Sequence, residues 1–406
     1  MRPVRPYHPA SDEAGFDGHD FDPVAPSAVA RGGPRLSALS RLCGQLLSVG
    51  FDGPTMPAEL RARIAASAVG GVMLFRPNVV NAGQVAALVG SLRGAAPDDL
   101  PLLVSIDQEG GLVMRLRGLA TDWPAMLAVG GAADTARTQS VGRALGEELA
   151  ALGIGWDFAP VLDVHTNPAN PVIGNRAFGT TPDAVIAQAL AFWRGLRGAG
   201  VVGCGKHFPG HGDTRTDSHL ELPVVDHAPA RLRAVELAPF AAAAKVGMEA
   251  FMTAHVLFPA LDPDWPATLS RKILTGVLRG ELGFEGVIVS DDLGMKAVAD
   301  RYPIEELAVA SIEAGADHLL VREPAARQVA AHEALVRAAE SRPDFRARVE
   351  ESAARVAALK AACRVGPPAP SAMLPSLLAT AAHRALAGSF KPVAADSPAK
   401  TSPVAD

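Results

Sequence analysis

The chain has 406 residues, of which 49% are hydrophobic and 20% are charged, and its net charge is −5. This length and apolar content are sufficient for one large barrel or for two or three ordinary domains. The weak negative charge, without a basic block, argues against nucleic acid or an anionic membrane as a partner. No apolar run is long enough to cross a bilayer, and the N-terminus lacks the apolar stretch of a secretory signal.

The cysteine content indicates a reducing compartment. Cys43, Cys204 and Cys363 lie far apart and lack the spacing of metal ligands. An odd and small number of cysteines argues against a disulfide framework. We therefore predict a cytoplasmic protein.

Both ends of the chain are predicted to be flexible tails. Residues 1–34 are rich in Pro, Asp, Gly and Ala and show no periodicity, which predicts a loose N-terminal arm. Residues 366–406 have a similar Pro- and Ala-rich composition and predict a C-terminal tail, in which residues 373–386 could form a short helix. The catalytic unit is then expected to span residues 35–365.

Between the tails, short apolar segments alternate with longer segments that have apolar residues at a 3.6-residue spacing. The short segments predict buried parallel strands, and the longer ones predict helices, several of which end in Gly. The predicted strands are residues 43–49, 71–75, 101–106, 154–160, 201–205, 250–253, 286–289 and 318–321. The predicted helices are residues 58–67, 83–92, 135–152, 182–198, 230–245, 272–282 and 303–314.

About eight strand–helix alternations favour an α/β fold with a single closed (β/α)8 barrel. A doubly wound sheet is the alternative, and it would need a glycine fingerprint after an early strand. Gly110 and Gly111 follow the third predicted strand but lack the further glycine and the downstream acidic residue of that fingerprint.

Polar residues follow most of the predicted strands, and in a barrel the carboxyl ends of the strands form the active face. Carboxylates and cations alternate along this series, while aromatic residues make up only 5% of the chain. This combination favours a small substrate rich in hydroxyl groups. In chain order the series is Asp107 and Arg115, Asp163, Arg176, Lys206 and His207, His255, and Asp291 and Asp292.

Two groups in this series are suited to catalysis. Asp291 follows a buried strand and could attack an electrophilic carbon as an ionised carboxylate, while Asp292 could cap the next helix. The glycine-rich loop after Lys206 contains Asp217 and His219. A carboxylate can orient an imidazole and raise its basicity, so we expect His219 to transfer a proton and Asp217 to assist it.

A carboxylate nucleophile with a separate proton donor is the arrangement of retaining glycoside cleavage. A neutral imidazole does not repel an anion, so phosphate could replace water as the acceptor. Asp107, Arg115, Arg176, Lys206 and His207 would then bind sugar hydroxyls. For Arg115 and Arg176, a salt bridge at the rim is an equally good interpretation.

The same residues resemble the β-N-acetylglucosaminidases of glycoside hydrolase family 3. The resemblance covers the predicted barrel and not the tails, and several ordered motifs together are far more specific than any one alone. The motifs are residues 44–46 (GQL), 50–53 (GFDG), 107–111 (DQEGG), 172–179 (VIGNRAFG), 206–212 (KHFPGHG), Thr214, 217–219 (DSH), 252–255 (MTAH) and 283–295 (GFEGVIVSDDLGM).

The resemblance implies a retaining exo-β-N-acetylglucosaminidase that acts on peptidoglycan-derived muropeptide fragments in the cytoplasm, without a metal or organic cofactor. It implies that Asp291 is the nucleophile, that His219 with Asp217 is the acid/base, and that the five residues named above bind the sugar. We expect a monomer. The family's usual Arg after the glycine pair is Leu112 here, which could alter specificity or affinity.

Several alternatives remain open at this stage. Within the family, the chain could be a phosphorylase or a β-glucosidase, or it could use the acetamido group of the substrate as the nucleophile. Outside it, Lys206 at a strand end could form a Schiff base in an aldolase. A non-catalytic sugar-binding protein is the remaining class.

Overall fold

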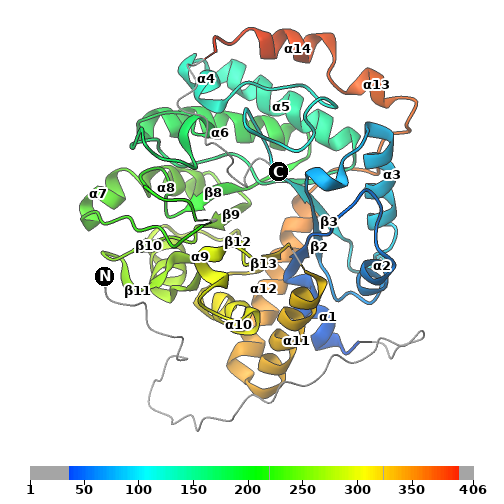
Figure 1. Cartoon of the computed structure of the whole chain (residues 1–406), viewed down its shortest axis with the longest axis vertical. Coiled ribbons are helices and arrows are strands. Elements are labelled where there is room, and N and C mark those ends of the chain that lie inside the picture. The colour runs from blue at the N-terminus through cyan, green and yellow to red at the C-terminus, as the bar shows by residue number, and fades with distance from the viewer. Residues whose placement is uncertain (1–35, 219, 323, 393–406) are drawn as a thin grey trace.

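A closed barrel of parallel strands forms the centre of the computed structural model, which describes residues 36–218, 220–322 and 324–392 (Figure 1). The predicted N-terminal arm, His219 and residues 393–406 lie outside the described residues. Neighbouring strands pair in parallel in the order β7-β6-β3-β2-β1-β13-β12-β9-β8. These strands are β1 (Leu47–Val49), β2 (Gly71–Leu74), β3 (Leu103–Ile106), β6 (Trp156–Asp157), β7 (Val202–Gly203), β8 (Gly205–Phe208), β9 (Ala250–Thr253), β12 (Val287–Asp292) and β13 (His318–Val321).

The two strands at the ends of this order, β7 and β8, are separated only by Cys204 and are two parts of one strand. Backbone hydrogen bonds join this strand to the segment after β6, from Cys204 N to Ala159 O at 2.8 Å and from Leu162 N to Lys206 O at 2.7 Å. The sheet therefore closes with eight strand positions, and the predicted (β/α)8 barrel is confirmed.

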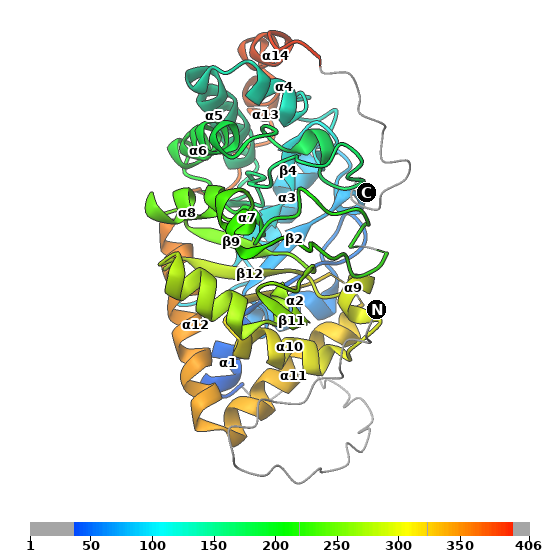
Figure 2. The same cartoon turned by 90° about the vertical axis from the view of Figure 1, so that its left-hand side faces the viewer.

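Helices surround the barrel, with α4 to α6 on one side of the strands and α10 to α12 on the other (Figure 2). Two short hairpins, β4 with β5 and β10 with β11, extend from the ends of β3 and β9. The larger helices are α1 (Ala38–Gln45), α2 (Ala58–Ala65), α3 (Ala82–Arg93), α5 (Thr135–Ala151), α6 (Pro182–Gly198), α8 (Ala238–Lys245), α10 (Ile304–Ala314), α11 (Ala325–Ser341) and α12 (Pro343–Ala362). The shorter elements are η1 (Arg76–Asn78), β4 (Gln108–Gly110), β5 (Val113–Met114), α4 (Met126–Gly131), η2 (Gly174–Arg176), α7 (Pro229–Ala234), β10 (Leu257–Phe258), β11 (Asp262–Pro266), η3 (Ala267–Leu269) and α9 (Lys296–Ala299).

Two apolar clusters hold this arrangement together. One fills the inside of the barrel and includes Trp156, Phe158, Val202 and Val289. The other lies between the strands and the surrounding helices. Because both faces of each strand are buried, most strand residues are apolar, and the polar exceptions, such as Ser48 in β1 and Ser105 in β3, are themselves buried.

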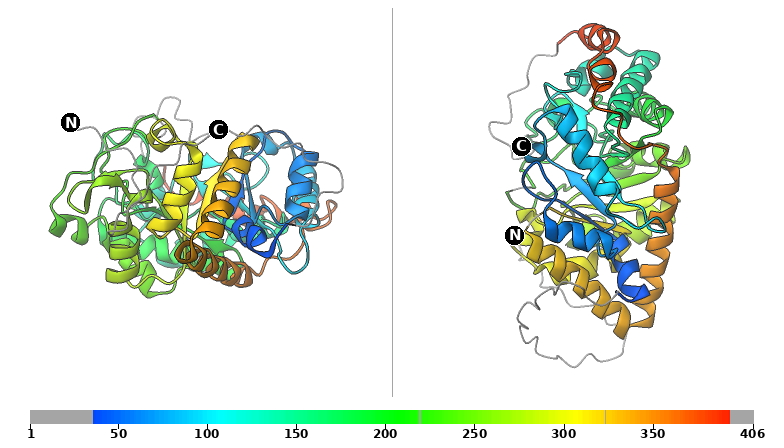
Figure 3. Two further views of the ribbon diagram at one scale, coloured as in Figure 1. Left: turned by 90° about the horizontal axis from the view of Figure 1, so that it is seen from below. Right: turned by 90° about the vertical axis from the view of Figure 1, so that its right-hand side faces the viewer.

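The first predicted strand, residues 43–49, is wrong in its first half, which belongs to α1. Ser37 caps this helix by accepting a hydrogen bond from Ser40 N. The helix packs closely because Gly44 has no side chain: a Cβ there would come within 2.1 Å of Ser67 O. Figure 3 shows α1 beside α11 and α12, helices that are distant in sequence and were not predicted.

Two predicted helices also differ from the structure. Residues 230–245 form two helices, α7 and α8, because Pro239 starts a new helix rather than continuing the first. Residues 272–282 form η4 (Lys272–Glu281), a π-helix with wider turns than the predicted 3.6-residue spacing.

The described part of the predicted C-terminal tail, residues 366–392, packs against the barrel helices instead of being loose. It contains α13 (Leu374–Leu377) and α14 (Ala381–Gly388), which lie along α5 (Figure 1). Leu374, Leu378 and Phe390 are buried. The apolar side chains of this segment cover α5, which the Pro- and Ala-rich composition did not reveal.

Candidate active site

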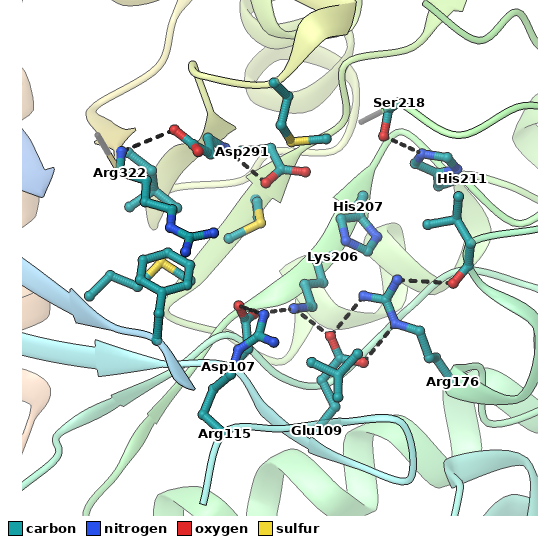
Figure 4. Close-up of a pocket in the computed structure, with 18 residues that line it drawn as sticks. Asp107, Glu109, Arg115, Arg176, Lys206, His207, His211, Ser218, Asp291 and Arg322 are labelled. Atoms are coloured by element: carbon teal, nitrogen blue, oxygen red, sulfur yellow. Dashed lines mark hydrogen bonds and ion pairs between the residues drawn. The ribbon is translucent and has the colours of Figure 1, made fainter. Parts of the chain in front are cut away.

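One cavity collects polar side chains from the carboxyl ends of several barrel strands (Figure 4). Six of the eight predicted site residues line it, namely Asp107, Arg115, Arg176, Lys206, His207 and Asp291. Asp217 does not line the cavity, but the next residue, Ser218, does, and His219 lies outside the described residues. The rest of the lining is Met73, Phe75, Glu109, Val113, Val172, His211, Met252, Asp292, Met295, Leu320 and Arg322.

A chain of alternating carboxylates and cations forms one wall of the cavity. Lys206 Nζ lies 2.7 Å from Asp107 Oδ1 and 2.6 Å from Glu109 Oε1. Arg176 donates two hydrogen bonds to Glu109, at 2.9 and 2.8 Å, and Arg115 lies 3.3 Å from Asp107 Oδ2. All five side chains are buried, so each charge depends on its partners for stabilisation.

These pairings keep the groups ionised. Burial would by itself raise the pKa of Glu109, but Arg176 and Lys206 lower it well below the ordinary range. Burial would likewise lower the pKa of Lys206, but Asp107 and Glu109 raise it to about 12. Lys206 is therefore an ammonium ion at neutral pH, which disfavours the Schiff-base aldolase alternative because that chemistry needs the free amine.

A second polar group fixes the start of the glycine-rich loop. Asp163 accepts a hydrogen bond from His207 Nδ1 at 2.7 Å and from the backbone N–H of His211 at 2.6 Å. Burial would raise the pKa of Asp163, but His207 and His211 lower it below its ordinary value. Burial lowers the pKa of His211 to about 4, so this imidazole is neutral at physiological pH.

Asp291 and Asp292 are the last residues of β12, which extends three residues beyond the predicted strand. Asp291 Oδ1 accepts the backbone N–H of Asp292 at 2.8 Å. Asp292 Oδ1 accepts the N–H groups of Gly294 at 2.9 Å and Arg322 at 3.1 Å, and burial raises the pKa of Asp292. The predicted capping role of Asp292 is wrong, because Asp292 binds the turn after the strand and Met295 is the N-cap of α9. Asp292 also lines the cavity together with Asp291.

The loop that contains Asp217 is anchored by the side chain and the backbone of Ser218. Ser218 Oγ lies 3.1 Å from His211 Nε2, and Ser218 O accepts the N–H of Ala297 in α9 at 3.3 Å. Asp217 is buried, and its carbonyl accepts N–H groups from Leu220 and Glu221. The loop therefore lies against the cavity, close to the end of β12.

Four residues that line the cavity had no predicted role in the site, namely Glu109, His211, Ser218 and Arg322. The position of Glu109 was a usable signal, because residues two apart in an extended segment point to the same side, and Asp107 was already predicted. Arg322 follows the last barrel strand and lies in none of the recognised motifs. His255, which was expected at the active face, does not line the cavity; it contacts Thr268 and the carbonyl of Asp292 and supports that backbone.

Among the residues that the structure describes, no group of three or more His, Cys, Asp and Glu side chains has an arrangement that could hold a metal ion. In the same part of the chain, no helix combines the length and apolar character needed to span a bilayer.

The barrel is similar to known proteins in both sequence and structure. The family model described as Glycosyl hydrolase family 3 N terminal domain matches residues 39–359. A Beta-hexosaminidase from Alkalilimnicola ehrlichii is 41% identical over 281 residues, which cover 68% of this chain and 80% of that protein.

Two solved structures provide the structural comparison. A glycoside hydrolase family 3 beta-N-acetylglucosaminidase from Paenibacillus sp. aligns with a TM-score of 0.82 and 43% identity, covering 87% of this chain and 68% of that chain. NagZ from Neisseria gonorrhoeae in complex with N-trifluoroacetyl-D-glucosamine aligns with a TM-score of 0.63 and 35% identity, covering 77% and 98% of the two chains.

Proposed function

The chain belongs to glycosyl hydrolase family 3 as a β-N-acetylhexosaminidase, and on this basis we propose that it releases a terminal β-linked N-acetylglucosamine with retention of configuration. The observation that carries this proposal is the position of Asp291. It lies at the carboxyl end of β12 and lines the same cavity as the buried network of Asp107, Glu109, Lys206 and Arg176.

In the first step, a carboxylate oxygen of Asp291 attacks the anomeric carbon, and the bond from that carbon to the leaving oxygen breaks. His219, assisted by Asp217, gives the leaving oxygen its proton. The contacts of Ser218 with His211 and α9 support this role, because they hold the residue before His219 at the cavity. In the second step, His219 takes a proton from water, whose oxygen attacks the anomeric carbon and displaces Asp291.

The cavity wall provides charged hydrogen bonds for the sugar. Asp107 and Glu109 can accept hydrogen bonds from hydroxyls, while Lys206, Arg176 and Arg115 can donate them. The mutual pairing of these groups keeps their side chains in place before substrate binds, which reduces the reorganisation needed in the transition state. His207 is held by Asp163 in the same way.

We further propose that the substrates are fragments derived from peptidoglycan, since a NagZ is among the solved structures that resemble this chain. The cytoplasmic location and the monomeric state stay predictions. Incubation with N-acetylglucosaminyl-anhydromuramyl fragments should release free N-acetylglucosamine, detectable by mass spectrometry.

The direct test uses an aryl β-N-acetylglucosaminide. The purified protein should release the aryl alcohol, and Asp291→Ala should lose at least about 1,000-fold in kcat because the nucleophile is missing. Asp300→Ala is the matched control, because Asp300 ends α9 and does not line the cavity. Activity of the wild type on the β-glucoside alone would instead identify a β-glucosidase. Sugar 1-phosphate formed in phosphate buffer would identify a phosphorylase.

A further inference from the structure

Arg322 lines the cavity although it lies outside every motif recognised in the sequence. It directly follows β13, the strand next to β12 in the barrel. Its backbone N–H donates to Asp292 Oδ1 at 3.1 Å, and its carbonyl accepts from Gly50 N at 3.1 Å and from Gln328 Nε2 at 2.7 Å. The backbone of Arg322 is therefore fixed relative to the strand end that bears Asp291.

The side chain of Arg322 is also held in place. Its guanidinium carbon lies 4.3 Å from the centroid of the Phe75 ring, a cation–π contact. Gly50 makes room for this pair, because a Cβ at that position would come within 3.0 Å of both Arg322 Cγ and Phe75 Cε2. A stacked guanidinium directs its N–H groups within its own plane. Figure 4 shows the side chain of Arg322 directed into the cavity.

The position of Arg322 complements that of the other cations. Arg176 and His207 lie on the opposite side of the cavity from Arg322 (Figure 4). Asp291 and Asp107 lie between these two sides, at different edges of the cavity. A pyranose ring with its anomeric carbon at Asp291 and its far end near Asp107 therefore presents substituents to both sides. The predicted Arg115 also lies near Phe75, at 5.9 Å from the ring centroid, but it is paired with Asp107 at 3.3 Å. The guanidinium of Arg322 is a further hydrogen-bond donor on this side of the cavity.

We propose that Arg322 is a specificity-determining residue that donates hydrogen bonds to one oxygen substituent of the bound sugar, on the flank that faces Phe75. This inference rests on the proposed function, since it takes the ligand to be a 2-acetamido sugar. A hydrogen bond from a charged group to a neutral acceptor in a desolvated site changes kcat/KM by about 10- to 100-fold.

Two variants separate hydrogen bonding from packing. Arg322→Met removes the N–H donors and keeps an unbranched side chain against Phe75. Arg322→Lys keeps the charge but loses the planar group. Arg76→Met is the matched control, because Arg76 follows Phe75 in sequence, is exposed and does not line the cavity.

Each variant is measured with the aryl β-N-acetylglucosaminide and with four analogues, which lack the acetamido group or the 3-, 4- or 6-hydroxyl. Isothermal titration with the five corresponding free sugars gives the same comparison without turnover. We expect Arg322→Met to lower kcat/KM and affinity for the complete sugar by about 10- to 100-fold. For the one analogue that lacks the substituent bound by Arg322, the loss should be less than about threefold, because no hydrogen bond is left to remove. The kcat/KM and sugar affinity of Arg322→Lys should lie between those of Arg322→Met and the wild type. Arg76→Met should have the same kcat/KM and sugar affinity as the wild type.

A loss smaller than about threefold on the complete sugar would overturn the inference. An equal loss on the complete sugar and on all four analogues would also overturn it, because the effect would then come from folding or from Asp291. A wild type that binds N-acetylglucosamine without hydrolysing the aryl glycoside would contradict the proposed function alone. The titrations would still decide the role of Arg322.

Discussion

The substitution Glu109→Gln tests the buried charge network most severely. Glu109 accepts two hydrogen bonds from Arg176 and forms an ion pair with Lys206, and only 1% of its side chain is exposed. Glutamine has nearly the same shape, but its amide is neutral and its NH2 group would face a cationic donor. Lys206 would keep its ion pair with Asp107, whereas Arg176 would lose the carboxylate that pairs with its guanidinium.

Removing one partner of a buried ion pair costs about 3–5 kcal/mol, because the other charge stays buried without compensation. We therefore expect the free energy of unfolding at pH 7 to fall by about 3–5 kcal/mol. We expect kcat/KM to fall by roughly 100-fold, because a displacement of Lys206 or Arg176 by ~1 Å misplaces the sugar.

The assay is urea denaturation followed by circular dichroism, with enzyme kinetics on the same preparations. Glu350→Gln is the control, since Glu350 forms an exposed pair with Arg346 and should change stability by less than about 0.5 kcal/mol. Because the folded pKa of Glu109 is lowered, its stabilisation is present above the unfolded value near 4.5 and is lost as the pH falls below that value. A Glu109→Gln protein within about 1 kcal/mol of the wild type at pH 7 would refute the reasoning.

Two further predictions concern the barrel interior and the C-terminal segment. His318 forms a hydrogen bond with Ser48 Oγ at 2.7 Å, and burial lowers the pKa of His318 to about 3. Between pH 6.5 and 3 the unfolded state therefore binds more protons than the folded state, and the free energy of unfolding falls as the pH drops. His318→Gln should reduce this slope by up to about 1.4 kcal/mol per pH unit in urea titrations at several pH values, and an unchanged slope would contradict the account. Glu148 accepts hydrogen bonds from the backbone N–H groups of Thr121 and Ala379. Glu148→Ala should therefore lower the free energy of unfolding by about 2–4 kcal/mol, and hydrogen-exchange protection should fall first in residues 374–390. Protection equal to that of the wild type would show that Glu148 does not hold this segment.

The sequence was sufficient to predict those parts of the fold that depend on local pattern. Residues 250–253 and 318–321 are strands with the predicted boundaries, because short apolar runs in a parallel sheet are buried on both faces. The apolar run at 43–49 was misleading, since a buried helix end and a buried strand have the same composition over so few residues. Packing of α1 on α11 and α12 decides the outcome there, and that packing is tertiary.

In the site, too, some residues could be predicted from local sequence pattern and others depend on tertiary packing. Asp107, Lys206 and Asp291 could be predicted because each follows a recognisable strand, and the carboxyl ends of barrel strands share one face. Glu109 and Arg322 could not be assigned in the same way. The role of Glu109 depends on Arg176, which is 67 positions away, and that of Arg322 depends on stacking against Phe75. Contacts between distant segments leave no periodic pattern in the sequence.

The central claim is that Asp291 forms a covalent bond to the anomeric carbon. A 5-fluoro sugar analogue that keeps the 2-acetamido group slows the second step and should leave the glycosyl group on the enzyme. Peptide mass spectrometry should then find the sugar mass on the peptide that contains Asp291, and no label on Asp291→Asn. An analogue that is cleaved but leaves Asp291 unlabelled, or that labels another carboxylate, would contradict the account and favour the acetamido group of the substrate as the nucleophile.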